Sequence, residues 1–312
     1  MGSSMGRLRD LSSGKTHWLE PEHVVGRAVI CGSRLNHKYI SAQHAALRWA
    51  GTHWELKDLG SRNGTFLEGV RLKPGEELTL REGSKIAFGK PNEDLWELVD
   101  ASAPTVMAVP VDGGDAVLLD GEMLALPSSE DPRATIYRNG EGCWVLEQAE
   151  DSAWPITNRQ TFEVAGRSWR FSCSESLGTT SLATSSAELE VRHLQLSFSV
   201  SRDEEHVHLH VTSAGRTFDL GTRNHNYLLV TLARRRLADA VEGIPDTVCG
   251  WIYLEDLAHD ATMAPPQLNI DVFRIRKQFA AIGVIDAGNI IERRPRTRQL
   301  RIGTAHLLVT QL

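Results

Sequence analysis

Residues 56–69, LKDLGSRNGTFLEG, place a polar tetrapeptide, Ser61–Gly64, between a strand-like apolar run and a threonine followed by a phenylalanine. From Trp18 to Val99, short segments of the same β-like kind alternate with joins that contain glycine, asparagine, proline or serine. This spacing is typical of an all-β sandwich, in which loops gather at the two ends of the strands. We therefore expect residues 1–100 to form a β-sandwich that presents Ser61–Gly64 at one end.

Two earlier joins of this region also carry polar groups, the pair Gly26-Arg27 and the stretch from Ser41 to His44. An arginine offers phosphate a rigid fork of donors, and a serine hydroxyl adds one more. An asparagine amide, as in Asn63, both donates to and accepts from a peptide backbone. If alternate joins converge at one end of the sandwich, these residues form a phosphopeptide clamp.

The order GR, SxxH and LxDLxSxNGT resembles the signature of the forkhead-associated (FHA) domain over roughly residues 18 to 98. That family reads phosphothreonine. The resemblance implies that Arg27 and Ser41 hold the phosphate, that Arg62 lines the same site, and that Asn63 bonds the main chain of the peptide. It gives an architectural role to four further residues: Gly26, His44, Ser61 and Gly64.

One position departs from some relatives, because Ala42 follows the serine where they have a polar residue. Arg34, His37 and Lys38, in the preceding loop, add positive charge that can compensate. The alternative is a β-sandwich that no longer binds a phosphopeptide.

Residues 101–173 continue the β-like pattern, and the stretch from Arg133 to Leu146 echoes the one from His44 to Leu56 in its alanine, glycine and tryptophan placement. This region is either a degenerate FHA copy without the clamp residues or an unrelated small β-domain. Residues 174–190 are rich in serine and threonine and poor in large apolar groups, which predicts a linker. If phosphorylated, Thr179, Thr180 or Thr184 can enter the clamp of the same or a neighbouring molecule and so mediate self-association.

Residues 191–312 combine strand-like runs, three helical stretches and a final hairpin. This order resembles the winged-helix output domain of OmpR-type response regulators over about residues 191 to 305. The closing Arg301-Ile302-Gly303 departs from the usual end of that wing. The whole chain is thus expected to be multidomain and mainly β, with a C-terminal α+β module.

The charge of the chain is uneven. The net charge is −6, yet residues 270–312 hold 8 basic and 3 acidic side chains. A helix with one buried face and one cationic face fits the major groove of double-stranded DNA, and a basic wing turn can reach the adjacent backbone. The expected DNA contacts are Arg274, Arg276, Lys277, Gln278, Arg293, Arg294, Arg296 and Arg298. A solvated helix face, or docking of a protein, are the alternatives.

Other features suggest neither catalysis nor a cofactor. The chain lacks the signatures of P-loop, zinc-protease, hydrolase and kinase sites, so we do not expect an enzyme. The four cysteines lie far apart, which fits buried thiols in a reducing compartment. His206, His208 and His210 share one strand face, but residues two apart on an exposed strand need no metal to explain them, so we expect no metal site.

No apolar run reaches the roughly 18 residues that a membrane helix needs, and the polar start lacks the apolar core of a secretory signal. We expect a cytoplasmic bacterial regulator that couples Ser/Thr kinase signalling to transcription. The rival is an adaptor whose winged helix docks a protein.

Overall fold

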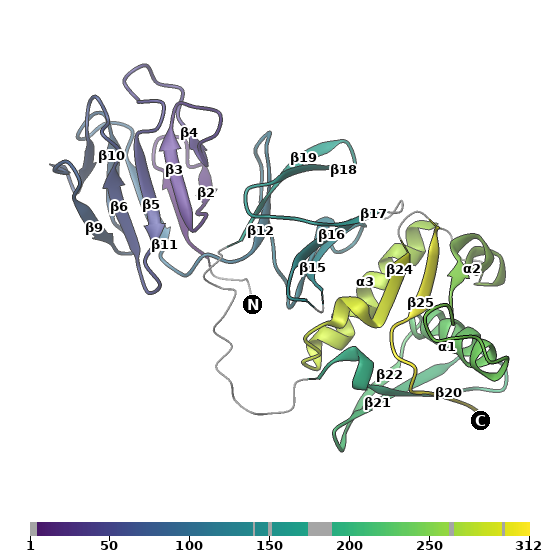
Figure 1. The fold of residues 1–312 in the computed structure, drawn as a ribbon. Helices are drawn as coiled ribbons and strands as arrows, with labels where there is room; N and C mark the ends of the chain where they lie inside the picture. Colours follow the sequence, from purple (N-terminus) through teal and green to yellow (C-terminus); the bar gives the residue numbers. More distant parts are fainter. Residues whose placement is uncertain (1–4, 140, 149–151, 174–188, 262–264, 295–296) are drawn as a thin grey trace. The chain divides into compact units, whose positions relative to one another are not determined.

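The computed structural model describes residues 5–139, 141–148, 152–173, 189–261, 265–294 and 297–312 (Figure 1). The chain divides into two compact units. The N-terminal unit comprises Met1–Met107 with Phe171–Thr180, and the C-terminal unit comprises Ala108–Arg170 with Ser181–Leu312. The middle β-rich stretch therefore packs with the C-terminal module, although the sequence predicted separate domains. Thr179, Thr180, Thr184 and most of the predicted linker lie outside the described residues.

The N-terminal unit is built from two β-sheets, as its alternating pattern predicted. The six-stranded sheet has the order β2-β1-β11-β10-β7-β8 and the five-stranded sheet the order β4-β3-β5-β6-β9. The strands of the larger sheet are β1 (Arg7–Asp10), β2 (Thr16–Trp18), β7 (Thr65–Leu67), β8 (Val70–Arg71), β10 (Lys85–Phe88) and β11 (Trp96–Asp100). Those of the smaller sheet are β3 (Glu22–Gly26), β4 (Ser33–Arg34), β5 (Ala45–Trp49), β6 (Trp54–Asp58) and β9 (Glu77–Leu80).

Strand β6 shows how the core fixes the loop that opened the sequence analysis. Trp54 and Leu56 are fully buried in the core of this unit. Burial of one such side chain contributes about 1.5–3 kcal/mol relative to leaving it in water. The period-2 alternation then carries Asp58 to the end of the strand, where the polar loop begins.

Residues 107–172 form two smaller sheets. One has the order β13-β12-β19-β18 and the other the order β14-β15-β16-β17. The strands of the first are β12 (Met107–Pro110), β13 (Val117–Leu118), β18 (Thr161–Val164) and β19 (Arg167–Ser172). Those of the second are β14 (Met123–Pro127), β15 (Pro132–Arg138), β16 (Trp144–Gln148) and β17 (Ser152–Pro155).

The internal echo in the sequence corresponds to a hairpin in each unit. Arg138 pairs with Trp144 between β15 and β16, as Trp49 pairs with Trp54 between β5 and β6. The sheets around these hairpins differ in strand number. The sequence similarity therefore corresponds to a hairpin in both regions. That residues 101–173 are a degenerate FHA domain stays a prediction.

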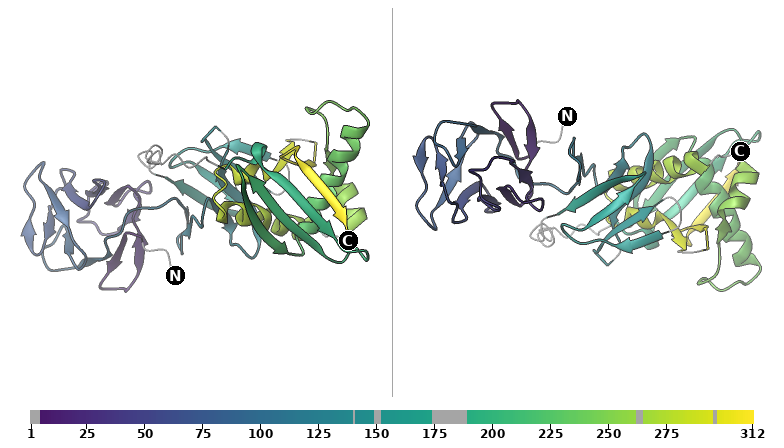
Figure 2. Two further views of the ribbon diagram at one scale, coloured as in Figure 1. Left: turned by 90° about the horizontal axis from the view of Figure 1, so that it is seen from below. Right: turned by 90° about the horizontal axis from the view of Figure 1, so that it is seen from above.

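The remainder of the C-terminal unit has the predicted order of strands, three helices and a hairpin. Strand β26 (Leu307–Gln311) runs parallel to β20 (Gln195–Val200) and completes the first sheet of residues 191–312, which has the order β22-β21-β20-β26, as the yellow strand beside the green ones shows in Figure 2. Two short 3₁₀ helices are η2 (Val191–His193) and η3 (Ala287–Ile290). The strands and helices are β20 (Gln195–Val200), β21 (Val207–Ser213), β22 (Arg216–Thr222), α1 (Asn226–Val241), β23 (Ile252–Tyr253), α2 (Leu254–Ala261), α3 (Pro265–Ala281), β24 (Ile291–Arg294), β25 (Gln299–Ile302) and β26 (Leu307–Gln311).

One hydrophobic core joins both parts of the C-terminal unit. Met123, Tyr137 and Val145 from the middle sheet belong to the same buried cluster as Phe273 and Phe279 of α3. Strand β15 packs against α3. Removing residues 108–170 would therefore expose part of the surface that stabilises α3.

Within the described residues, no helix combines the length and the apolar character needed to cross a membrane.

Candidate functional site

Three loops of the N-terminal unit are tied together by hydrogen bonds at one end of its sheets. The backbone N–H of Arg27, just after β3, donates to the carbonyl of Ser41 at 2.9 Å. The backbone N–H of Arg62, just after β6, donates to Ser41 Oγ at 3.1 Å. Ser41 therefore links the loops that carry the two arginines.

The close approach of β3 to the Ser41 loop depends on Gly26. A Cβ atom at this position would lie 2.4 Å from the carbonyl oxygen of Ala42. Any side chain here would push the loops apart. Gly26 thus allows the close packing of β3 against the Ser41 loop.

His44 braces the loop from inside and is fully buried. Its Nδ1 accepts a hydrogen bond from the Ser41 N–H at 3.1 Å, which leaves the proton on Nε2 to donate to the Gly64 carbonyl at 3.0 Å. Burial lowers the pKa of His44 more than its bond to Gly64 and the charge of Asp58 raise it. The neutral ring therefore connects the Ser41 loop to the Ser61–Gly64 loop.

Asp58 and Ser61 shape the Ser61–Gly64 loop. Asp58 accepts hydrogen bonds from the hydroxyls of Ser61 and Thr65, both at 2.6 Å, and from the Ser61 backbone at 2.8 Å. The Ser61 hydroxyl in turn accepts from the Gly64 N–H at 2.9 Å. Burial raises the pKa of Asp58, but these bonds outweigh it and lower that pKa. Ser61 is thus a loop brace.

Asn63 and Gly64 complete this loop. The Asn63 side chain donates to the Tyr39 carbonyl at 2.7 Å, so its amide nitrogen is engaged and its oxygen can accept from a ligand. Gly64 has φ of +89°, a conformation that other residues rarely adopt. A Cβ atom there would also lie 2.4 Å from Arg71 Nε.

Arg71 is a cation that the sequence analysis missed. It is exposed on β8, and its guanidinium covers the backbone of Gly64. The pairing of Phe66 with Arg71 across the β7–β8 hairpin brings it there. The sequence could have indicated this contact. A short hairpin directly after the loop places the residues of its second strand next to the loop.

Several exposed side chains of these loops are cationic, although His37 lies 4.0 Å from the carboxylate of Asp94. Arg27, Arg62 and Lys38 are exposed, while Ser41 and Asn63 are half-buried between them. Arg34 Nε donates to the Arg27 carbonyl at 3.3 Å and so belongs to the same surface. A phosphate placed here would meet guanidinium donors and a hydroxyl in a frame that is already formed.

Residues 23–89 match the family model described as the FHA domain. The N-terminal unit contains an FHA domain. The match covers the residues that form the tied loops, from His23 on β3 to Gly89 after β10.

Curated relatives are similar to this chain over short stretches. FhaB of Mycobacterium tuberculosis, called an FHA domain-containing protein, is 32% identical over 72 residues, which are 23% of this chain and 45% of that protein. FraH of a Nostoc species is 38% identical over 55 residues, 18% of this chain and 19% of that protein. The chain thus spans less than half the length of these relatives.

A solved structure of Mycobacterium tuberculosis EmbR in complex with a low affinity phosphopeptide also resembles part of the chain. The identity is 24%, the similarity covers 32% of this chain and 26% of that one, and the TM-score is 0.29.

The second predicted site, on α3, has a different environment from the one expected. Arg276 is buried and donates two hydrogen bonds to Glu147 of β16, each at 3.0 Å. Arg293 Nε of β24 lies 2.8 Å from the same carboxylate, and the Tyr137 hydroxyl donates to it at 2.9 Å. Burial raises the pKa of Glu147, but the two guanidinium groups outweigh it and lower that pKa. We call Glu147, Arg276, Arg293 and Tyr137 the buried charge cluster.

The remaining predicted residues of α3 are partly engaged as well. Gln278 donates to the Leu220 carbonyl at 2.8 Å and bonds His225 at 2.8 Å. Lys277 forms an ion pair with Asp120 at the surface. Arg274 is exposed.

The predicted wing residues also differ in their surroundings. Arg294 donates to the Thr247 carbonyl at 3.2 Å, and its guanidinium lies over the ring of Trp251. Arg298 is exposed, and Arg296 lies outside the described residues.

The positions of these residues differ from the predicted DNA-contact surface. Arg276, Gln278 and Arg293 were predicted to face DNA, but in this structure they hold the C-terminal unit together. The reason is that the middle sheet covers the part of α3 that carries Arg276. Glu147 was the missing partner, and its place in the apolar run CWVLEQ was a signal that it could be buried.

Proposed function

We propose that this protein binds a phosphothreonine-containing partner through its FHA domain and transmits that event to a winged-helix output in residues 191–312. The observation that carries the proposal is the set of three tied loops that present Arg27 and Arg62 around the Ser41 hydroxyl. The FHA family match supports the same reading of the site.

The hydrogen-bond pattern explains how the clamp would work. Ser41 Oγ accepts from the Arg62 N–H, so its own hydroxyl hydrogen can donate to a phosphate oxygen. The Arg27 guanidinium, on an exposed side chain after β3, supplies charge-assisted donors. The Asn63 amide oxygen accepts from the peptide backbone. The phosphate therefore meets a charged donor and a hydroxyl donor, and the peptide backbone meets one acceptor.

The first experiment measures binding of a phosphothreonine peptide to the full chain and to Arg27→Ala. We expect at least a ten-fold loss of affinity in the variant with an unchanged unfolding midpoint, because Arg27 is exposed. The matched control is Arg81→Ala: Arg81 is also exposed, but it follows Leu80, which pairs with Trp54 at the other end of β6. Equal affinity in Arg27→Ala and the unsubstituted chain would contradict the proposal.

For the output, we propose contact with double-stranded DNA, which would couple Ser/Thr kinase signalling to transcription. The element order of the C-terminal unit and the exposed cations Arg274 and Arg298 support it. Full use of the α3 face would also require the middle sheet to separate from it, since Arg276 is paired with Glu147. DNA binding would then compete with that ion pair.

One observation favours the alternative of a phospho-dependent adaptor. The face of α3 that carries Arg276 is already a protein-contact surface, because the middle sheet of the same chain packs on it. An adaptor would offer this face, or the sheet that covers it, to a protein partner.

The two outputs are separated by selecting sequences from a random duplex DNA pool with the full chain. The full chain is preferred to residues 191–312, because the shared core would be cut in that fragment. DNA binding predicts enriched sequences whose affinity falls with salt, and a smaller salt dependence in the double variant Arg274→Ala, Arg298→Ala. An adaptor predicts no enrichment.

A further inference from the structure

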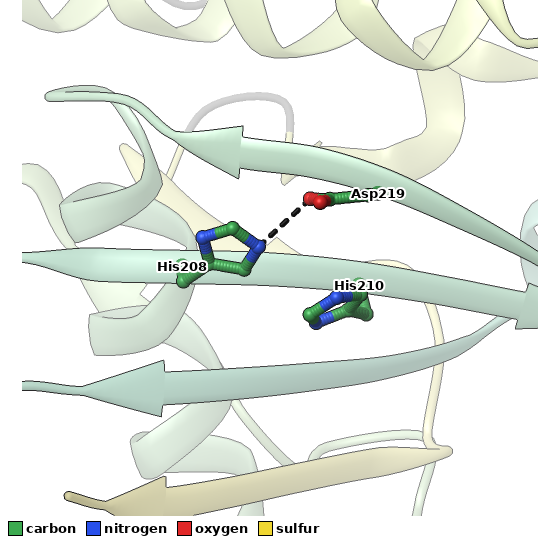
Figure 3. Close-up of side chains that lie close together, drawn as sticks. All are labelled: His208, His210 and Asp219. Atoms are coloured by element: carbon green, nitrogen blue, oxygen red, sulfur yellow. Dashed lines mark ion pairs between the residues drawn. The ribbon is translucent and has the colours of Figure 1, made fainter.

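Two histidines and an aspartate come together on the exposed face of the first sheet of residues 191–312. His208 and His210 lie on β21 and Asp219 on β22, and all three side chains project from the same face (Figure 3). Their possible ligand atoms all lie within 4.8 Å of one another. We call these residues the His–Asp cluster.

The sheet register explains why the three residues meet. Leu209, between the two histidines, is buried, so the alternation of the strand turns both imidazoles outward. His210 is directly opposite Asp219, whereas Leu209 is opposite Gly221. This β-bulge shifts the register by one residue and brings the carboxylate beside the histidines. The sequence alone does not bring Asp219 beside the histidines, because this residue comes from the neighbouring strand.

The closest pair is in direct contact, slightly closer than two ligands on one ion. His208 Nε2 lies 2.8 Å from Asp219 Oδ1. Bonds of about 2.0–2.2 Å from zinc to imidazole nitrogen and to carboxylate oxygen would place two such ligands about 3.4 Å apart in a tetrahedral site, so this pair has to separate only slightly to admit an ion. The His210 ring, centred 4.7 Å from that of His208, needs only a side-chain rotation to join them.

Thr222 supplies an outer partner for His208. Its hydroxyl lies 3.1 Å from His208 Nδ1, on the ring nitrogen opposite to the one that faces Asp219. When Nδ1 donates to this hydroxyl, Nε2 keeps a lone pair that can bind a metal in place of its contact with Asp219. Asp219 is also oriented, because its Oδ1 accepts the Gly221 N–H at 2.8 Å.

We propose that His208, His210 and Asp219 bind a divalent transition-metal ion of the zinc type, with Thr222 as the outer partner of His208. Two imidazoles with one carboxylate suit Zn²⁺ better than Mg²⁺, which prefers oxygen ligands. Three protein ligands leave at least one coordination position for water or for a group of another molecule. This site is separate from the phosphopeptide clamp, and its failure would leave the proposed function intact.

The test is calorimetric titration of the full, untagged chain with ZnCl₂. We expect one binding event that is lost in His208→Gln, His210→Gln and Asp219→Asn. Each loss should exceed the roughly ten- to hundred-fold weakening that removal of an outer partner causes, which is the expectation for Thr222→Val. Asp219→Asn keeps an acceptor for Gly221, and the replaced side chains are at least partly exposed, so the variants should fold.

The matched control is His206→Gln, because His206 belongs to the same histidine-rich stretch but lies outside the cluster. Zinc affinity should be unchanged in this variant, and MgCl₂ should give no comparable binding. Zinc should also raise the unfolding midpoint of the unsubstituted chain but not that of Asp219→Asn. Equal weakening by His206→Gln, or full binding by Asp219→Asn, would overturn the site.

Discussion

At the scale of single residues, the neutral form of His44 connects two loops of the proposed phosphopeptide clamp. Its Nδ1 must carry a lone pair to accept from the Ser41 N–H. A proton added there would break that bond and place a charge in the core. Acid should therefore affect both the stability of the N-terminal unit and the position of Ser41.

We predict that the stability of the N-terminal unit falls as pH drops below the unfolded histidine pKa of 6.5, because burial lowers the pKa of His44 in the folded state. The stabilisation is fully present above pH 6.5 and decreases as the unfolded state takes up the proton first. One group contributes at most about 1.4 kcal/mol per pH unit. Thermal unfolding of the full chain at pH 5 and pH 7 measures this.

His44→Gln is the informative variant, since an amide can accept from Ser41 and donate to Gly64 without titrating. It should show a smaller loss of stability between pH 7 and pH 5. Burial, with Lys15 nearby, also lowers the pKa of His17, so His17→Gln should remove part of the remaining loss. An unchanged pH profile in His44→Gln would contradict the assignment.

At the scale of elements, the buried charge cluster attaches the middle sheet to α3. We predict that Glu147→Ala lowers the free energy of unfolding of the C-terminal unit by about 3–5 kcal/mol, because Arg276 and Arg293 would be left without their shared partner. Urea unfolding of the full chain measures the change.

The control for this prediction is Asp120→Asn, which removes the surface pair with Lys277 on the same helix. Exposed ion pairs contribute little, so its stability should stay close to that of the unsubstituted chain. The pH dependence gives a second check. The lowered pKa of Glu147 means that its contribution is present above pH 4.5 and lost as pH falls further. Glu147→Ala should therefore reduce the acid sensitivity of the C-terminal unit.

The Ser61–Gly64 loop and helix α3 show why a loop is easier to predict from the sequence than the surroundings of a helix face. The Ser61–Gly64 loop is organised by neighbours, since Asp58 and Ser61 are three residues apart. Its parts carry a local signature that can be read from one segment. Glu147 and Arg276 are 129 residues apart, and the helical pattern of α3 does not say which element packs on it. The sequence can therefore assign cationic residues to the correct helix without showing that another element buries them.

At the scale of the whole molecule, the proposed regulator needs its two units to affect each other's binding. The clamp lies in the N-terminal unit, whereas α3 and the basic hairpin lie in the C-terminal unit. Linkage requires that any effect of phosphopeptide on DNA affinity be matched by an equal effect of DNA on phosphopeptide affinity. This reciprocity distinguishes a coupled regulator from two modules that merely share a chain.

We predict that a saturating phosphothreonine peptide changes the affinity of the full chain for its selected DNA by about 5- to 150-fold, the usual range of such coupling. The same factor should appear when peptide affinity is measured with and without that DNA. Both are measured by fluorescence anisotropy at one fixed salt concentration, because DNA affinity depends strongly on salt. Arg27→Ala should abolish the effect of peptide on DNA binding while leaving DNA affinity without peptide unchanged. If peptide leaves the DNA affinity unchanged and DNA leaves the peptide affinity unchanged, the two sites are not coupled, even if each ligand binds well alone.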